Sequence, residues 1–362
     1  MSDGRGGLSP SLCQFDPEPK SAPVLRGNRN ARILSSILGV IGGPRFERAT
    51  HGPPSFPHRD RREDAMGYLG WLYDTGQGVA RDYVKARKWY EKAADKDNAS
   101  AMFNLGLLYA NGEGVTQDYA KAREWYEKAA DKGNAIAMVN LGLIYAHGQG
   151  VTQDYAKARE WYEKAADKGD ASAMGNLGLI YAHGQGVTQD YTKAREWYEK
   201  AADKGDAEAK ANLEKLPIME ANGAGRYAEA LQLQETLAAR VEAVETERAG
   251  KPGEETEQAL ISVTWYALLA REFTKALTVA DRAHALLPDD LSIETNRAHA
   301  LMFLERGEEA QALYLAYKGK PVSEQDAKLW ERVIAEDFAE FRKAGLTHPM
   351  MADIEKALGV SP

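Results

Sequence analysis

Residues Ala101–Ile136 read AMFNLGLLYANGEGVTQDYAKAREWYEKAADKGNAI, and the same pattern returns three more times along the chain. The copies begin 36 residues apart, at Ala65, Ala101, Ala137 and Ala173. The nine residues HGQGVTQDY even recur unchanged, once in the third copy and once in the fourth. A fixed period of this length is typical of stacked supersecondary units, each of which buries its apolar face against its neighbours.

Each copy contains two segments in which apolar residues recur at helical spacing. In the second copy, helix A is expected over 101–110, with an apolar face made of Met102, Leu105, Leu108 and Tyr109. Helix B is expected over 118–132, and its apolar face consists of Tyr119, Ala122, Tyr126, Ala129 and Ala130. We expect Asp118 or Thr116 to cap the start of helix B. Gly133 is expected to end the helix in the left-handed conformation.

Glycine recurs at two kinds of place in the repeat. Gly106, Gly142 and Gly178 lie inside helix A, where glycine costs about 1 kcal/mol relative to alanine. Such a repeated cost predicts that helix B approaches too closely for a side chain. Gly112 and Gly114 lie between helices A and B, where positive φ permits a tight turn. This turn follows no strand and precedes no P-loop lysine, so we do not expect it to bind phosphate.

These motifs resemble the Sel1-like repeat family, a relative of the tetratricopeptide repeat. The matching elements are L-G-x-x-Y in helix A, G-x-G-V in the turn, and D-Y-x-K-A and W-Y-x-K-A-A in helix B. The resemblance covers about Ala65–Leu216, and it implies a right-handed superhelix of antiparallel helix pairs that binds other proteins. Some secreted bacterial relatives have cysteine-bridged repeats and are linked to β-lactam binding. This chain has one cysteine, Cys13, and no Ser-x-x-Lys pair.

The pattern changes beyond the fourth copy. Residues Ala207–Leu216 start a fifth helix A, which we expect to end before Pro217 and to cover the last apolar face. Residues 272–290 (EFTKALTVADRAHALLPDD) resemble the second helix of a tetratricopeptide repeat, with Ala276 at a small position and Pro288 at the terminal proline. Closing helices are expected over the last residues, where aromatic residues recur at helical spacing. The predicted fold is therefore all-α, a right-handed α-solenoid of antiparallel helix pairs.

Three regions are predicted from these changes: an Arg-, Pro- and Gly-rich extension over 1–62, Sel1-like repeats with a terminal half-repeat over 63–216, and a tetratricopeptide-like array over 217–362. Eight of the fourteen prolines fall in the first region, which favours disorder there. Its apolar stretch Ile33–Ile41 follows several arginines. A cytoplasmic protein is expected, or an exported one if this stretch belongs to a signal segment.

Composition excludes several classes of function. The net charge of -8 argues against generic binding of nucleic acid. A single cysteine excludes an internal disulfide and a cysteine-built zinc site. No apolar run reaches the roughly 20 residues that span a bilayer. The seven histidines show no close metal spacing, so we predict no catalytic site, no metal and no cofactor. The four Trp–Tyr pairs that begin at Trp89 and end at Tyr198 are expected to pack between helices.

A polar stripe recurs on helix A and is the candidate site. In helix A, an asparagine precedes the leucine of the L-G-x-x-Y motif. A second leucine lies three residues after this asparagine, and an asparagine or histidine lies seven residues after it. In related tetratricopeptide folds, helix A lines a concave groove, and an asparagine before Leu-Gly contacts bound peptide. The predicted groove residues are Asn104, Leu107, Asn111, Asn140, Leu143, His147, Asn176, Leu179, His183, Asn212 and Asn296. The alternative is that these asparagines hydrogen-bond from helix to helix and hold the superhelix together.

The predicted function is a non-enzymatic adaptor or scaffold that binds a protein or peptide in the concave groove. Asparagine offers both a donor and an acceptor, so it can pair with an extended backbone without selecting its side chains. One alternative is an envelope-associated or polysaccharide-linked binding protein, and another is a hydrolase with a cryptic site.

Overall fold

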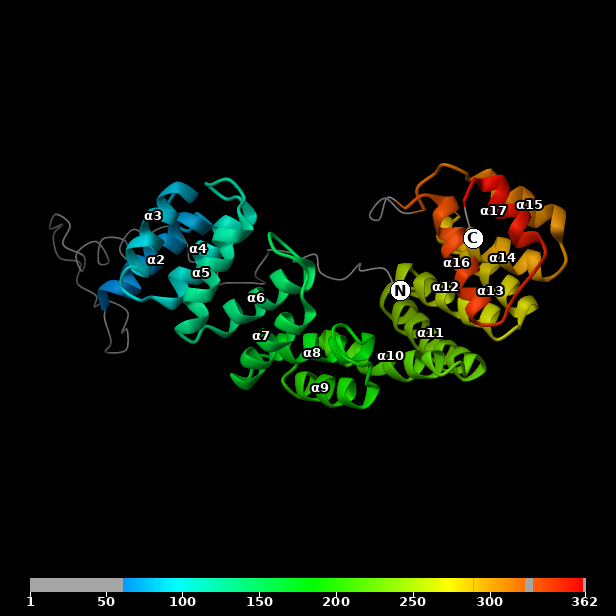
Figure 1. Ribbon diagram of the computed structural model, residues 1–362, viewed down its shortest axis with the longest axis horizontal. Coiled ribbons are helices and arrows are strands. Elements are labelled where there is room, and N and C mark those ends of the chain that lie inside the picture. Colours follow the sequence, from blue (N-terminus) through cyan, green and yellow to red (C-terminus); the bar gives the residue numbers. More distant parts are fainter. Residues whose placement is uncertain (1–60, 289, 323–327, 361–362) are drawn as a thin grey trace. The chain divides into compact units, whose positions relative to one another are not determined.

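The computed structural model describes residues 61–288, 290–322 and 328–360 (Figure 1). The predictions for residues 1–60, including Ile33–Ile41 and Cys13, lie outside the described residues. The chain divides into two compact units, with the boundary between Asp170 and Ala171. The first three repeats therefore lie in unit 1 and the fourth in unit 2, while the predicted region boundary at 216/217 stays a prediction.

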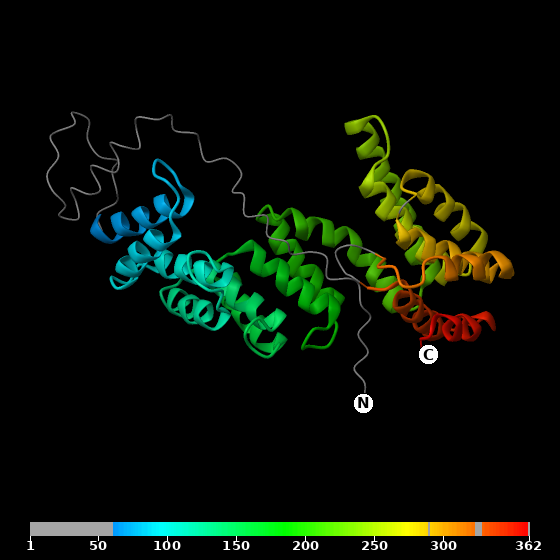
Figure 2. The same cartoon turned by 90° about the horizontal axis from the view of Figure 1, so that it is seen from above.

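Unit 1 consists of three helix pairs, in which each helix packs against the next in chain order (Figures 1 and 2). The bounds are α2 (Arg61–Thr75), α3 (Tyr83–Ala94), α4 (Ala99–Asn111), α5 (Tyr119–Asp131), α6 (Ala135–His147) and α7 (Tyr155–Asp167). Helices α2, α4 and α6 are the A helices of the repeats, and α3, α5 and α7 are the B helices.

Polar side chains set the helix boundaries where the sequence predicted them. The carboxylate of Asp118 accepts from the backbone N–H of Lys121 at 3.0 Å and caps α5, so the Asp118 prediction is confirmed. Asn134 caps α6 in the same way, through the N–H of Ala137 at 2.9 Å. The turn glycines adopt positive φ, 73° at Gly112 and 67° at Gly114, as does Gly133 at 90°. Backbone geometry that favours glycine therefore recurs at each turn of the repeat.

The glycine inside each A helix faces the buried tyrosine of its own B helix. A methyl group built on this glycine would meet a ring carbon at 2.3–2.4 Å in all four repeats, in the pairs Gly70–Tyr90, Gly106–Tyr126, Gly142–Tyr162 and Gly178–Tyr198. No real methyl group approaches a ring carbon so closely. The predicted close approach of helix B is confirmed, and the tyrosine ring fills the space that the glycine leaves.

Unit 2 continues the pattern of successive packed helices. Its helices are α8 (Ala171–His183), α9 (Tyr191–Asp203), α10 (Ala207–Gly223), α11 (Tyr227–Ala249), α12 (Glu254–Leu269), α13 (Phe273–Leu286), α14 (Leu291–Phe303), α15 (Gly307–Ala316), α16 (Trp330–Lys343) and α17 (Met350–Leu358). The described residues contain no strand, apart from an isolated bridge between Pro321 and Leu329. The predicted all-α fold of stacked helix pairs is confirmed.

Helix α10 corrects one prediction. We expected it to end before Pro217, but it runs through this proline to Gly223. Proline removes one backbone hydrogen bond from a helix interior. Leu216, Ile218 and Ala221 on either side are nevertheless buried. Burial of this apolar face offsets the lost hydrogen bond and keeps the helix continuous.

The last helices enclose an aromatic core. Trp330, Phe338 and Phe341 of α16 are completely buried, as their helical spacing in the sequence indicated. His299 of α14 lies among them, with Nδ1 2.8 Å from the Tyr314 hydroxyl and Nε2 3.0 Å from a carboxylate oxygen of Asp337. These polar contacts join α14, α15 and α16 within the apolar core.

Candidate partner-binding surface

The predicted stripe of unit 1 lies on α4 and α6. Two hydrogen bonds hold the ends of these helices against the following turns, because Gln117 Nε2 donates to the Ala110 carbonyl and Gln153 Nε2 to the Ala146 carbonyl, both at 2.7 Å. The first two positions on each helix are half-buried and the third is exposed: Asn104, Leu107 and Asn111 on α4, and Asn140, Leu143 and His147 on α6.

The first repeat occupies the same positions with different chemistry, which the sequence analysis did not single out. The equivalents on α2 are Tyr68, Trp71 and Thr75, and the repeat register of 36 residues was the signal that locates them. Tyr68 and Trp71 stack, with ring centroids 5.4 Å apart and an interplanar angle of 23°. We call the nine positions on α2, α4 and α6 the A stripe: Tyr68, Trp71, Thr75, Asn104, Leu107, Asn111, Asn140, Leu143 and His147.

The asparagines of the A stripe differ in their contacts. Asn140 of α6 hydrogen-bonds to the hydroxyl of Tyr126 in the preceding B helix; burial raises the pKa of that hydroxyl, and this bond lowers it in part. In the first repeat, the Tyr90 hydroxyl instead donates to Asp74 of its own A helix at 3.0 Å. Among the described residues, no hydrogen bond reaches the Asn104 amide. Asn140 therefore has the contact expected of a helix-to-helix bond, whereas Asn104 is open to a partner.

The predicted groove residues of unit 2 fall on three helices. Asn176, Leu179 and His183 lie on α8 with the same pattern of exposure as on α6, and Asn212 lies half-buried on α10. Asn296 on α14 is only 5% exposed and donates to the Ile261 carbonyl at 3.4 Å. Its amide is therefore engaged inside the unit.

The Trp–Tyr pairs divide between core and surface. The four tyrosines are buried, in agreement with the expected packing between helices. The tryptophans are half-buried, and a lysine three residues later covers each ring, as Lys128 Nζ covers Trp125 at 4.0 Å from the ring centroid. The covered rings are not free stacking platforms.

A small hollow and possible metal ligands are the other candidate features of the described residues. Unit 1 has a shallow hollow of about 280 Å³ beside the turn 114–118, lined also by Arg87, Tyr109 and Lys121, and the A stripe does not contribute to it. No group of three or more histidine, cysteine, aspartate or glutamate side chains is arranged to hold a metal ion in the described ranges.

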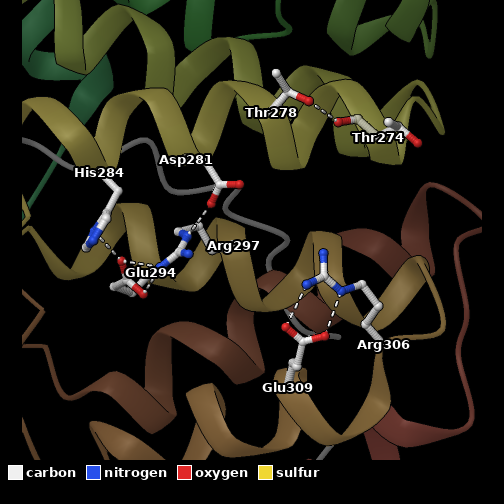
Figure 3. A network of polar contacts seen from close by, with 8 residues as sticks. All are labelled: Thr274, Thr278, Asp281, His284, Glu294, Arg297, Arg306 and Glu309. Carbon is white, nitrogen blue, oxygen red and sulfur yellow. Dashed lines mark hydrogen bonds and ion pairs between the residues drawn. The ribbon is translucent and has the colours of Figure 1, made fainter.

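Buried charges in unit 2 are paired between helices. Glu294 of α14 lies 2.8 Å from Nδ1 of His284 and 3.0 Å from a guanidinium nitrogen of Arg297, whose Nε bonds Asp281 at 2.8 Å (Figure 3). Figure 3 shows that the contacts of Glu294 with His284 and of Arg297 with Asp281 run between α14 and α13, while Glu294 and Arg297 pair within α14. The network offsets the cost of burying the Glu294 carboxylate, which indicates a structural role.

Two buried glutamates have opposite electrostatics. Glu245 of α11 accepts from the Thr256 hydroxyl at 2.6 Å and from the backbone N–H groups of Gly253 and Thr256, and these bonds lower its pKa to about 2. Burial raises the pKa of Glu257 to about 7, and the negative charge of Asp290 adds to the effect. We assign both to the fold, because Glu245 is satisfied by hydrogen bonds within the unit and Glu257 is only 1% exposed.

Within the described ranges, every helix is too short or too polar to traverse a lipid bilayer.

Comparison with protein families identifies the class of helical repeat. The family model described as Sel1 repeat matches four consecutive segments, 63–98, 99–134, 135–170 and 171–206. These segments coincide with the four helix pairs α2/α3, α4/α5, α6/α7 and α8/α9. The chain therefore carries four Sel1 repeats.

Solved structures similar to this chain are also repeat proteins. A Sel1 repeat protein from Oxalobacter formigenes is 39% identical, with 42% of this chain and 63% of that chain covered and a TM-score of 0.40. The c5321 protein, a protective antigen of uropathogenic Escherichia coli strains with an SLR fold, is 25% identical, with coverage of 83% and 73% and a TM-score of 0.48. A tetratricopeptide repeat protein from Parabacteroides merdae is 14% identical, with coverage of 82% and 98% and a TM-score of 0.45. Among curated proteins, none matches.

Proposed function

We propose that this chain is a non-enzymatic adaptor or scaffold that binds a protein or peptide along the A stripe, as the concave groove of its helical repeats. Sel1 and tetratricopeptide-like repeats generally mediate interactions between proteins, and such repeats are typically non-catalytic scaffolds. The net charge of -8 favours a protein partner over nucleic acid.

One observation carries the proposal: the same partly exposed positions return on three successive A helices. Each of these helices is fixed against its B helix by the contact of a helix glycine with a buried tyrosine ring. A surface fixed in this way loses little conformational entropy when a partner binds. The half-buried leucines supply apolar contact, and the Asn104 amide supplies a donor and an acceptor for a backbone.

The test compares a stripe variant with a variant that adds the same charge elsewhere in unit 1. Leu107→Glu places a carboxylate on the A stripe, and Ala120→Glu places one on the exposed side of α5. Partners are captured from an extract of the source cells with the full chain, identified by mass spectrometry and titrated against both variants. We expect Leu107→Glu to lose the partner and Ala120→Glu to keep it, at equal melting temperatures.

Equal binding by both variants would place the partner elsewhere on the chain. Turnover of generic ester, peptide or phosphate substrates by the purified protein would favour the hydrolase alternative. We propose a cytoplasmic location, and recovery of the protein with the cell envelope on fractionation would favour the envelope-associated alternative.

A further inference from the structure

The A stripe has one aromatic end. Trp71 is 36% exposed, and it is the one aromatic residue of the described ranges among the exposed large hydrophobic side chains. It stacks on Tyr68 at 5.4 Å between ring centroids. In the next two repeats, asparagine takes the position of Tyr68, and leucine takes that of Trp71. The stripe is therefore asymmetric, with a broad apolar platform on α2 and amide groups on α4 and α6.

None of the nine A stripe positions carries aspartate, glutamate, lysine or arginine, although these residues make up 28% of the chain. The Glu113 carboxylate lies 3.4 Å from Asn111 Nδ2 at the edge of the stripe. Elsewhere along the stripe, a charged group of a partner would lose hydration without gaining a counter-ion. Charge complementarity thus favours an uncharged partner segment over the length of the stripe.

Hydrogen-bonding groups limit which residue of a partner fits at the aromatic end of the stripe. The Thr75 hydroxyl already donates to the Trp71 carbonyl at 2.8 Å, and ring faces offer no strong acceptor. A peptide N–H laid over the ring faces, out of reach of the Tyr68 and Thr75 hydroxyl oxygens, would therefore be covered without an acceptor, which is costly. Proline has no N–H, and proline-rich segments in the polyproline II conformation dock on aromatic surfaces with little loss of entropy.

We propose that the Tyr68–Trp71 pair seats a proline of an uncharged partner peptide, and that the Asn104 amide hydrogen-bonds the peptide backbone beyond it. The proposal rests on the adaptor function proposed above and adds the chemistry of the partner. It also gives the bound peptide a direction, because the proline fits at one end of the stripe only. A sugar ring is the other occupant that stacks on aromatic faces. The Asn104 amide favours the peptide, because an amide pairs donor for acceptor with a backbone.

The experiment uses the full chain and two matched variants. Trp71→Leu installs the residue that the other three repeats carry at this position, so it keeps the helix pair intact. Val84→Ala likewise installs the residue of the second and third repeats at an exposed position of α3, 45% exposed and outside the stripe. The probes are acetylated and amidated dodecapeptides of serine, asparagine and leucine, with proline, lysine or glutamate placed at each position in turn. Cellohexaose is titrated in parallel.

We expect the wild-type chain to prefer proline at one end of the dodecapeptide and to reject lysine and glutamate throughout. Trp71→Leu should weaken binding of the proline peptide about tenfold, the loss expected for one good aromatic contact, while Val84→Ala binds as wild type. Absence of binding to every dodecapeptide, or a preference for lysine or glutamate, overturns the proposal. Cellohexaose binding that Trp71→Leu abolishes makes the pair a sugar platform instead.

Failure of this proposal is distinguishable from failure of the adaptor function. If a captured partner is lost with Leu107→Glu but bound equally by Trp71→Leu and wild type, the groove stands and the proline site does not. If neither substitution affects the captured partner, both fall.

Discussion

Two glycines of helix α8 offer a direct measurement of the glycine–tyrosine contact. A methyl group added at Gly178 would lie 2.4 Å from a ring carbon of Tyr198, whereas one added at Gly175 would meet only a carboxylate oxygen of Asp206, at 3.7 Å. Both positions lie inside one helix, so Gly→Ala gains the same helix propensity of about 1 kcal/mol at each.

The packing cost falls on one variant only. Tyr198 is 1% exposed, so its ring cannot move into solvent, and overpacking of a core costs about 1–3 kcal/mol. We expect Gly175→Ala to stabilise unit 2 by up to about 1 kcal/mol. The free energy of unfolding of Gly178→Ala should lie about 1–3 kcal/mol below that of Gly175→Ala, because the gain in helix propensity is common to both variants.

Urea unfolding followed by circular dichroism and by tryptophan fluorescence measures the difference. The second and third repeats carry phenylalanine and valine at the Gly175 position, which supports the expectation that this site accepts a side chain. If the two variants unfold at the same urea concentration, the ring of Tyr198 does not press on α8, and the reason given for the four helix glycines is wrong.

Four further substitutions test polar contacts. Asn140→Ala should lower the free energy of unfolding by about 1–3 kcal/mol because it leaves the buried Tyr126 hydroxyl without its partner, while Asn104→Ala should change it by less than about 0.5 kcal/mol; equal effects in urea unfolding would contradict the difference in their contacts. Glu257→Gln should raise the melting temperature more at pH 8 than at pH 5, because the raised pKa of about 7 costs the folded state stability as pH rises from the unfolded value of 4.5. Glu245→Gln should lower the melting temperature equally at pH 5 and pH 8 and less near pH 2, because its lowered pKa of about 2 stabilises the folded state fully only above the unfolded value; a loss that grows from pH 5 to pH 8 would contradict this assignment.

The fold could be predicted from the sequence because the same local signals recur in each of the four repeats. Asp118 as a cap, Gly112 and Gly114 as turn residues, and Gly106 as a point of close approach are all local features, and the structure confirms them. The course of α10 through Pro217 was missed because it depends on tertiary burial of Leu216 and its neighbours, which overrides the local cost of proline.

The candidate site was less predictable than the fold. The repeat period places Asn104 and Asn140 at one position, but whether each is engaged depends on a residue elsewhere in the array. Asp74 satisfies one buried tyrosine, and Ala110 at the same position of the second repeat cannot satisfy the next. Recognition of Trp71 as part of the stripe required comparison between repeats, since a single exposed tryptophan carries no periodic signal.

The alternation of Asp74 and Asn140 as partners of buried tyrosines makes the order of the repeats matter. In the first repeat, the hydroxyl of the buried tyrosine is satisfied within its own helix pair, because Tyr90 donates to Asp74. In the second repeat, the partner of the Tyr126 hydroxyl is Asn140, which lies on the A helix of the next repeat. A chain cut after Asn98 would keep the partner of the buried Tyr90 hydroxyl, whereas one cut after Asn134 would remove that of Tyr126. Repeats that look interchangeable in sequence are thus not equivalent at their C-terminal side, because the second repeat needs the A helix that follows it and the first does not.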